Sequence, residues 1–279
     1  MNGIQFEEIG YWSEVKLDIV KKYAGAYTTI LAKQAGFRFF YIDGFAGAGF
    51  NLSKLGGELI PGSPLNALAV DPPFHEYFLI DLAGDKVDNL RSHSDIRDRH
   101  DVHVIHGDCN DVLLADIFPR VRWEDHHRAL CVLDPYGLHL DWRVLATAGE
   151  MGTIDIFLNF PLMGMNRDAL WRRPDAVSPE ARARMTACWG DESWRSVAYA
   201  SQTTLFGEDD LIKLDNEAIV RAFQERLRTV GGFKYVPDPM PMRNSRNAVI
   251  YYLFFASPKL VAERIVEDIF SKHRGRSGR

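Results

Sequence analysis

The sequence predicts an α/β fold in which a parallel β-sheet is doubly wound, with helices on both of its faces. Five short apolar runs alternate with helix-like segments over the first 160 residues, and this alternation is typical of such a sheet. An aspartate lies just past four of the five runs, at Asp43, Asp81, Asp108 and Asp134. Because the carboxyl ends of parallel strands meet at one edge, where these folds bind ligands, we expect the four acids to share one crevice.

The first half of the chain supplies the long first helix and the five strands. Residues 11–35 carry apolar side chains at helical spacing, and Gly36 is expected to end this helix. Strands are predicted over residues 38–42, 75–80, 102–105, 129–133 and 154–160. Helices are predicted between them, over residues 64–70, 83–97, 112–118 and 142–149, with Ser63 and Asp141 as candidate N-caps. Residues 50–61 are expected to form a loop.

The second half changes character after residue 160. Residues 161–230 are rich in Arg and Trp and lack strand-like runs, which predicts a helical insertion or cap with a helix starting at Ser178. Strands over residues 233–236 and 248–256 should close the sheet, and a helix over 259–271 should follow. The predicted division is therefore 1–160 for the first helix and core, 161–230 for the insertion, 231–272 for the closing unit, and 273–279 for a flexible basic tail.

Composition excludes several classes of function. The chain has 279 residues and a net charge of −5, which argues against general polyanion binding. Its three cysteines are widely spaced and form no C-x-x-C pair, so we expect neither a metal site nor a disulfide framework. No apolar run is long enough to span a bilayer, and the N-terminus lacks a signal-peptide pattern; both point to a cytoplasmic protein without membrane contact.

The glycine-rich stretch from Asp43 to Gly49 follows the first strand. Its glycines do not fit the G-x-G-x-x-G spacing of dinucleotide sites, and it lacks the G-K-[ST] of a P-loop, so a nicotinamide enzyme is disfavoured. The pattern D-x-F-x-G-x-G resembles motif I of S-adenosylmethionine (SAM) methyltransferases. That resemblance implies that Asp43 orients the loop or the methionine ammonium. The alternative is a purely structural turn. The implied cofactor loop consists of Asp43, Gly44, Phe45, Ala46, Gly47 and Gly49.

The next two strand ends supply further candidates. Asp81, with Leu82 beside it, could accept hydrogen bonds from both ribose hydroxyls, which two carboxylate oxygens do well; a helix cap is the alternative. Asp108, Cys109 and Asn110 could recognise adenine, or Asp108 or Asn110 could cap the following helix. Ser63 begins a helix whose N-terminus would face the glycine loop.

The fourth strand ends in Asp134-Pro135-Tyr136-Gly137, which resembles the D/N-P-P-Y motif of amino-methyltransferases. The resemblance implies that Asp134 and the Pro135 carbonyl hold an exocyclic amine in line with the methyl group, while Tyr136 stacks on the base. One proline is missing and the tyrosine comes one residue early, so a simple turn is the alternative.

Taken in order, these motifs resemble the three-Cys-motif partner protein (TcmP) family. The resemblance implies a class I methyltransferase fold with a Rossmann-like, SAM-binding core over residues 1–160, S-adenosylhomocysteine as product, and an antiparallel closing strand. The family is named for a genomic neighbour with a three-cysteine motif, which suggests an iron–sulfur, radical-type protein partner.

The leading hypothesis is methyl transfer from SAM to an amine of a nucleic-acid base or nucleotide-like acceptor. The alternative is a non-catalytic partner protein that assists a three-Cys-motif enzyme.

Trp12 and Lys16 share one face of the first helix. A core Trp and a solvated Lys are expected, with adenine contact by Trp12 as the alternative. The run Asn159-Phe160-Pro161, with Met163 and Met165, lines the acceptor side or belongs to the core. Candidate phosphate contacts, which could equally be solvated, are Arg167, Arg172, Arg173, Arg243 and Arg246.

Overall fold

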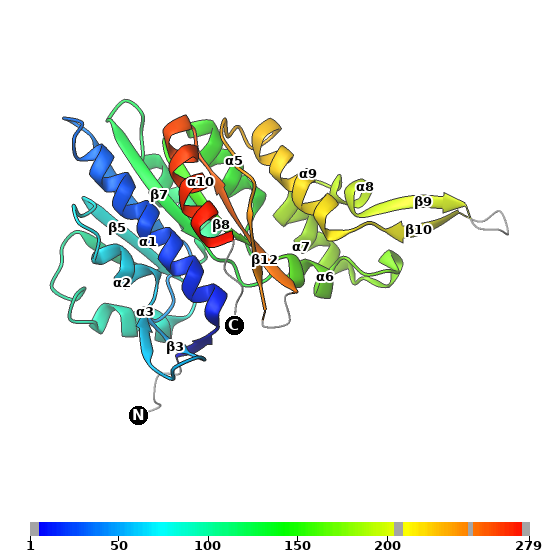
Figure 1. Ribbon diagram of the computed structural model, residues 1–279, viewed down its shortest axis with the longest axis horizontal. Helices are drawn as coiled ribbons and strands as arrows, with labels where there is room; N and C mark the ends of the chain where they lie inside the picture. The colour runs from blue at the N-terminus through cyan, green and yellow to red at the C-terminus, as the bar shows by residue number, and fades with distance from the viewer. Residues whose placement is uncertain (1–5, 204–208, 245–247, 275–279) are drawn as a thin grey trace.

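The computed structural model describes residues 6–203, 209–244 and 248–274. Within these residues, seven strands form one central sheet in the order β11-β12-β8-β7-β2-β5-β6 (Figure 1). Strand β12 is antiparallel to both of its neighbours, and the other adjacent pairs are parallel. The predicted doubly wound methyltransferase sheet with an antiparallel closing strand is confirmed. Its strands are β2 (Arg38–Asp43), β5 (Glu76–Asp81), β6 (Val102–His106), β7 (His127–Leu133), β8 (Ile154–Phe160), β11 (Met240–Arg243) and β12 (Val249–Ala256).

Alternate residues of each strand feed two separate hydrophobic cores, as the two-residue period of a strand requires. Phe39 and Tyr41 face the core beneath α1 (Tyr11–Leu31), α2 (Ser63–Leu68) and α10 (Leu260–Arg274). Phe40 and Ile42 face the opposite core, beneath α5 (Trp142–Met151) and α9 (Asn216–Thr229). Figure 1 shows α1 and α10 side by side on the first face.

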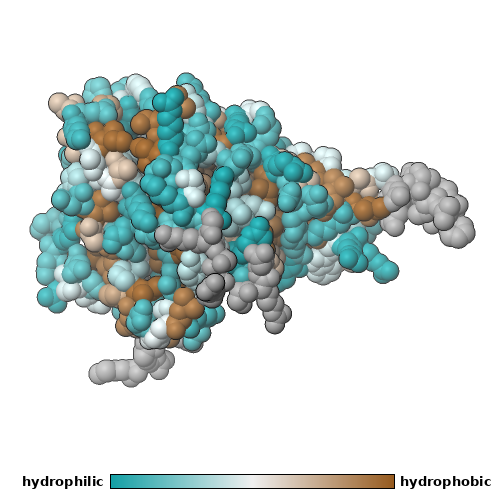
Figure 2. Space-filling view, in the orientation of Figure 1, coloured by the Kyte–Doolittle hydropathy of each residue, from teal (hydrophilic) through white to brown (hydrophobic). Residues whose placement is uncertain are grey.

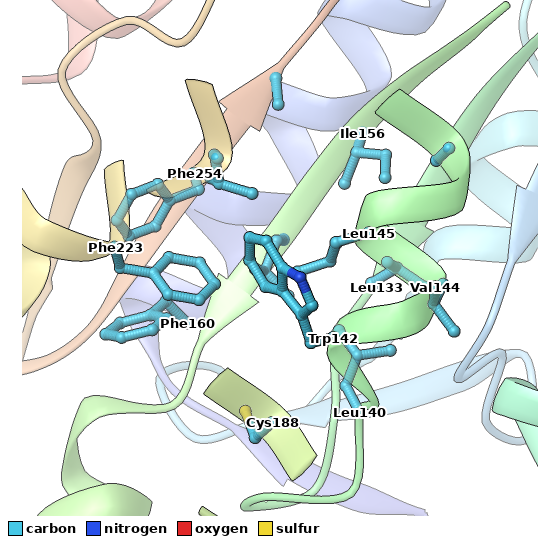
Figure 3. Close-up of a cluster of buried hydrophobic side chains, with 14 of the residues drawn as sticks. Leu133, Leu140, Trp142, Val144, Leu145, Ile156, Phe160, Cys188, Phe223 and Phe254 are labelled. Atoms are coloured by element: carbon cyan, nitrogen blue, oxygen red, sulfur yellow. The ribbon is translucent and has the colours of Figure 1, made fainter. Parts of the chain in front are cut away.

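Helix α9 packs directly on the sheet. Phe223 contacts Phe160 and Phe254 with ring centroids 4.5 and 5.4 Å apart, and Trp142 meets Phe223 edge-on at 5.8 Å (Figure 3). Because these rings come from α5, α9, β8 and β12, the cluster joins residues on both sides of the insertion. The insertion thus starts and ends at the sheet.

Close packing of α5 against the turn after α9 depends on Gly149. A Cβ at this position would lie 1.8 Å from the Gly231 carbonyl oxygen, far inside contact distance. We expect Gly149→Ala to lower the free energy of unfolding by about 3 kcal/mol, because overpacking a rigid backbone contact has few ways to relax. Gly25→Ala in α1 is the matched control: its Cβ would meet nothing within 4 Å. It should raise stability by about 0.5–1 kcal/mol. Urea denaturation measures both, and equal effects would contradict this packing.

A buried carboxylate ties α1 to the sheet. Asp155 of β8 accepts hydrogen bonds of 2.6 Å from the Tyr23 hydroxyl and from the Ser257 hydroxyl. Burial raises the pKa of Asp155 to about 6, and these two hydrogen bonds oppose the shift only in part. The folded protein therefore keeps a proton at Asp155 between about pH 4 and 6 that the unfolded chain has already lost.

The stability of the protein should consequently contain a component that decreases as the pH rises from about 4 to 6. Asp155→Asn removes this component. From pH 4 to pH 7 we expect the free energy of unfolding of the variant, relative to the unsubstituted protein, to rise by about 2–3 kcal/mol. Denaturant titrations at the two pH values measure it. A difference that stays constant across this range would contradict the raised pKa.

Several sequence predictions of local structure are wrong. Residues 50–61 are not a loop but form β3 (Phe50–Ser53) and β4 (Leu59–Pro61). Strand β3 lies between the N-terminal strand β1 (Glu7–Ile9) and β4 and pairs with both. Residues 233–236 are not the closing strand: only Tyr235 forms a bridge there, and β11 begins at Met240. The first helix ends at Leu31 rather than near Gly36, because the chain turns before the glycine.

The insertion also differs from the purely helical prediction. It contains the helices α6 (Leu162–Asp168), α7 (Pro179–Trp189) and α8 (Trp194–Ala198), but also an antiparallel hairpin of β9 (Tyr199–Thr203) and β10 (Asp209–Lys213). This hairpin projects from the body as an arm (Figure 1), and hydrophobic residues are visible along it in Figure 2. Ser178 caps α7 as predicted, since its hydroxyl accepts from the Ala181 N–H at 3.2 Å.

The remaining elements are short or lie near the ends. They are α3 (Gly84–Ser92), α4 (Cys109–Val112), a π-helical turn (Leu113–Ile117) and 3₁₀ turns at Phe118–Arg120 and Pro174–Ala176. Helix α10 continues to Arg274, so residues 273 and 274 of the predicted tail are helical, while 275–279 lie outside the described residues. No helix in the described part of the chain is long and apolar enough to cross a membrane.

Candidate functional site

A cavity of about 910 Å³ opens at the carboxyl ends of the parallel strands. Its volume lies in the range of about 300–1,000 Å³ that is usual for small-molecule sites. The sheet order reverses between β2 and β7, and this switch point is where doubly wound sheets bind ligands. The sequence-predicted residues that line the cavity are Gly44, Phe45, Ala46, Gly47, Gly49, Ser63, Asp81, Leu82, Asp108, Cys109, Asp134, Pro135 and Tyr136.

Asp43 lies beneath the cavity rather than on its surface. It is fully buried, and its carboxylate accepts from the Phe45 N–H at 3.2 Å and from the Tyr41 hydroxyl at 3.3 Å. Burial raises the pKa of Asp43 to about 6, while hydrogen bonds from Ser63 and Phe45 lower it. Of its two expected roles, this geometry supports orientation of the glycine loop.

The glycine loop turns through backbone conformations that favour glycine. Gly47 and Gly49 have φ of +66° and +90°. A Cβ on Gly47 would meet no protein atom within 4 Å, and Gly47 lines the cavity. The loop therefore leaves room for a ligand to approach the backbone closely. Gly62, not Ser63, occupies the N-cap position of α2, which corrects the sequence prediction.

Asp81 and Asp108 both line the cavity and already hold backbone donors. Asp81 accepts from the Gly47 N–H at 2.8 Å and from the Ala83 N–H at 2.9 Å. Asp108 caps α4 by accepting from the Asn110 N–H at 2.8 Å. A carboxylate has about four lone-pair sites, so both acids can accept further hydrogen bonds from a ligand.

Asn110 does not line the cavity. Its side chain donates to the His139 carbonyl at 2.9 Å and accepts from the Asp141 N–H at 2.7 Å. Asn110 thus ties the loop after β6 to the loop after β7 and supports the site from outside. Asp141 occupies the N-cap position of α5, but its side chain makes no capping hydrogen bond and instead pairs with Arg143 at 2.7 Å.

Asp134 forms the polar centre of the acceptor side. Its Oδ2 accepts a hydrogen bond from the Lys16 ammonium, and its Oδ1 accepts one from the Asn159 amide. Asn159 and Pro161 line the cavity, whereas Phe160 and Met165 are buried in the core. These contacts fix the orientation of the Asp134 carboxylate between α1 and β8.

Lys16 is a site residue that sequence reasoning missed. The expected solvated lysine is wrong, since its side chain is only 13% exposed and pairs with Asp134. Burial alone lowers the pKa of Lys16, but Asp134 and Tyr251 outweigh it, so the pKa is raised. The sequence signal for a buried Lys16 was its position on the helix. Lys16 stands four residues after Trp12 and three before Ile19, which are both buried core residues on the same helical face.

Tyr136 stands at the mouth of the cavity with 72% of its surface exposed. The Lys86 ammonium lies 6.0 Å from its ring centroid. Pro135, by contrast, is buried. The ring is therefore available to stack on a planar ligand, although the motif departs from D/N-P-P-Y.

The charges around the cavity suit a cationic ligand. Among the described residues, five carboxylates and three cationic side chains line it, which leaves an excess of two negative charges. No group of three or more His, Cys, Asp or Glu within the described ranges could hold a metal ion.

Only one of the described candidate phosphate-contact arginines lines the cavity. Arg167 lines the cavity, but Arg172, Arg173 and Arg243 do not. Arg246 lies outside the described residues.

Comparisons with known proteins agree with the fold. No family model matches the chain, and no curated protein matches it in sequence. Its structure is similar to that of protein LPL1258 of the DUF519 family from Legionella pneumophila, with 11% identity, 94% of each chain covered and a TM-score of 0.52. Two more distant matches are a putative SAM-dependent methyltransferase from Listeria monocytogenes (11% identity, 86% of this chain and 99% of that chain, TM-score 0.42) and a SAM-dependent methyltransferase from Leishmania major (10%, 88% and 82%, 0.37).

The sheet order and the position of the cavity define the class: this is a protein with a SAM-methyltransferase-like α/β fold. The resemblance to the TcmP family is carried by the sequence motifs alone.

Proposed function

We propose that this protein is a SAM-dependent methyltransferase that acts on an amine of a nucleic-acid base or nucleotide-like acceptor. One observation carries the proposal. The glycine loop, Asp81, Asp108 and the Asp134 motif, which lie far apart in sequence, line a single cavity at the switch point of the sheet.

The residues on the cavity wall fit SAM. The open space beside Gly47 leaves room for the methionine part against the loop backbone. Asp81 would accept from the ribose hydroxyls, and Asp108 with the Cys109 N–H would meet the adenine edge. The excess of carboxylates favours a ligand that carries a sulfonium and an ammonium.

Asp134 would position the acceptor. When bound, the cofactor supplies an electrophilic methyl group on its sulfonium sulfur. The acceptor nitrogen would attack this methyl carbon with its lone pair as the carbon–sulfur bond breaks, and it would release its proton to solvent. Asp134, held by Lys16 and Asn159, would accept a hydrogen bond from the amine and aim the lone pair. Catalysis of this kind depends mainly on positioning.

The exposed ring of Tyr136 supports a planar acceptor. A base within a duplex would have to be flipped out of the stack to reach Asp134. Pro161 and Gly164, which also line the cavity, would bound the space beside that base.

A second candidate is a non-catalytic protein that binds SAM and assists a three-Cys-motif enzyme. The observation that favours it is the state of Asp134: both of its oxygens are already engaged, by Lys16 and Asn159. In that role the ion pair would be structural, and no acceptor would approach it.

Methyl transfer separates the two candidates. The protein is incubated with methyl-labelled SAM and, separately, with RNA, single-stranded DNA and nucleotides, and the digested products are analysed by mass spectrometry. We expect label on an exocyclic amine of a base. SAM binding in calorimetry without label on any of these acceptors would favour the assisting role, and absence of SAM binding would refute both.

A further inference from the structure

A second cavity, of about 290 Å³, adjoins the first. The two cavities share Tyr136, Gly137, His139 and Arg167, so they meet on either side of this loop. The second cavity adds Asp168 and Arg184 to its wall. Because Tyr136 lines both cavities, part of an acceptor stacked on this ring could extend from the first cavity into the second.

Two glycines lie at the loop that the two cavities share. Gly137 has φ of +58°, and a Cβ there would lie 3.9 Å from Nη2 of Arg167 and 3.8 Å from Asp168. A Cβ on Gly164 would approach the Gly137 Cα to 3.3 Å. Gly137 lines both cavities and Gly164 lines the first, so a side chain at either position would take up space beside the shared loop.

Two arginines supply the charge of the second cavity. Arg167 is held by Asp168 through Nε at 2.6 Å and Nη2 at 2.9 Å, which leaves its Nη1 available for a ligand. Arg184 is exposed and donates no hydrogen bond to another described residue, while its charge interacts with the carboxylates of Asp168 and Glu180. With Asp168 counted and His139 neutral, the described wall carries one net positive charge.

We propose that this cavity binds a phosphate group of the acceptor, with Arg184 and the free edge of Arg167 as donors while the base stacks on Tyr136. The inference rests on the proposed function and narrows it to acceptors that carry a phosphate next to the reacting nucleoside. The planar guanidinium fork matches phosphate oxygens in geometry and charge. Asp168 fixes the position of Arg167 and reduces the net charge of the cavity wall to +1. This positive charge favours the binding of one phosphate ester, which is an anion.

The test compares ligands that differ only in the phosphate. Adenosine and cytidine are titrated against their 5′-monophosphates by calorimetry, with S-adenosylhomocysteine bound, on the unsubstituted protein and on Arg184→Gln. We expect the monophosphates to bind at least about tenfold more tightly than the nucleosides. In Arg184→Gln this ratio should fall to about twofold or less, while the affinities for the nucleosides and for S-adenosylhomocysteine stay unchanged.

Arg172→Gln is the matched control, since Arg172 is an exposed arginine that lines neither cavity; it should keep the full ratio. A dinucleoside monophosphate, with one phosphodiester, forms a second arm that distinguishes a nucleic-acid chain from a free nucleotide as the source of the phosphate. The proposal is supported if either phosphate-bearing ligand binds more tightly than the nucleosides and loses this higher affinity in Arg184→Gln.

Equal affinity for nucleoside and nucleotide in the unsubstituted protein, a full ratio retained in Arg184→Gln, or no binding of any of these ligands would overturn the phosphate site. Failure of the proposed function is seen separately: either S-adenosylhomocysteine does not bind in these titrations, or the methyl-transfer assay leaves no label on any acceptor.

Discussion

Asp134→Ala should lower the rate of methyl transfer by about 100-fold or more and leave the affinity for S-adenosylhomocysteine within about threefold. The carboxylate lies on the acceptor side of the cavity, between Lys16 and Asn159. Its loss removes the group that would aim the amine but none of the glycine loop, Asp81 or Asp108. Labelled-methyl transfer and calorimetry measure the two effects.

The structure also supplies the control for this variant. Asp134→Ala leaves the Lys16 ammonium without its partner at a site where only 13% of the side chain is exposed, and we expect a stability loss of about 2 kcal/mol. The double variant Lys16→Met/Asp134→Ala should recover most of this stability and none of the activity. Activity that returned together with stability would show that Asp134 serves the fold alone.

Gly47→Val should weaken SAM binding by about 100-fold, the upper end of a steric penalty of about 1–3 kcal/mol. The new side chain would start from a backbone with φ of +66° and enter open space beside a cavity wall. It would thus fill the room that the methionine part needs against the loop. Calorimetry with SAM gives the change in affinity.

Gly152→Val is matched to this variant in backbone strain. Gly152 ends α5 with φ of +62°, its Cβ would also meet nothing within 4 Å, and it does not line the cavity. Both variants should lose a similar amount of stability, but only Gly47→Val should lose SAM affinity. Equal affinities in the two variants would mean that the glycine loop does not hold the cofactor.

The sheet could be predicted from the sequence because its signals are local. Apolar runs that end at Asp43, Asp81 and near Asp134 mark the strands, and parallel pairing then brings their ends together. Even so, the roles of the acids differ in ways that periodicity does not encode. Asp43 is buried under the loop, while Asp81 and Asp134 face the cavity.

The features that were missed depend on contacts between distant segments. Strand β1 exists because Glu7–Ile9 pairs with β3, a partner more than 40 residues away. Lys16 becomes a site residue only because α1 packs on the sheet and brings its ammonium group to Asp134, at the carboxyl end of β7. Residues 233–236 carry strand-forming side chains, yet the sheet pairs β12 with Met240–Arg243 instead. Tertiary pairing overrides local propensity in each case.

A crystal structure with S-adenosylhomocysteine bound tests the central claim most directly. We predict that its ribose hydroxyls bind Asp81, that its adenine lies beside Asp108 and Cys109, and that its sulfur points toward Asp134. S-Adenosylhomocysteine bound away from the carboxyl ends of β2, β5 and β7, or with its sulfur turned away from Asp134, would contradict the account.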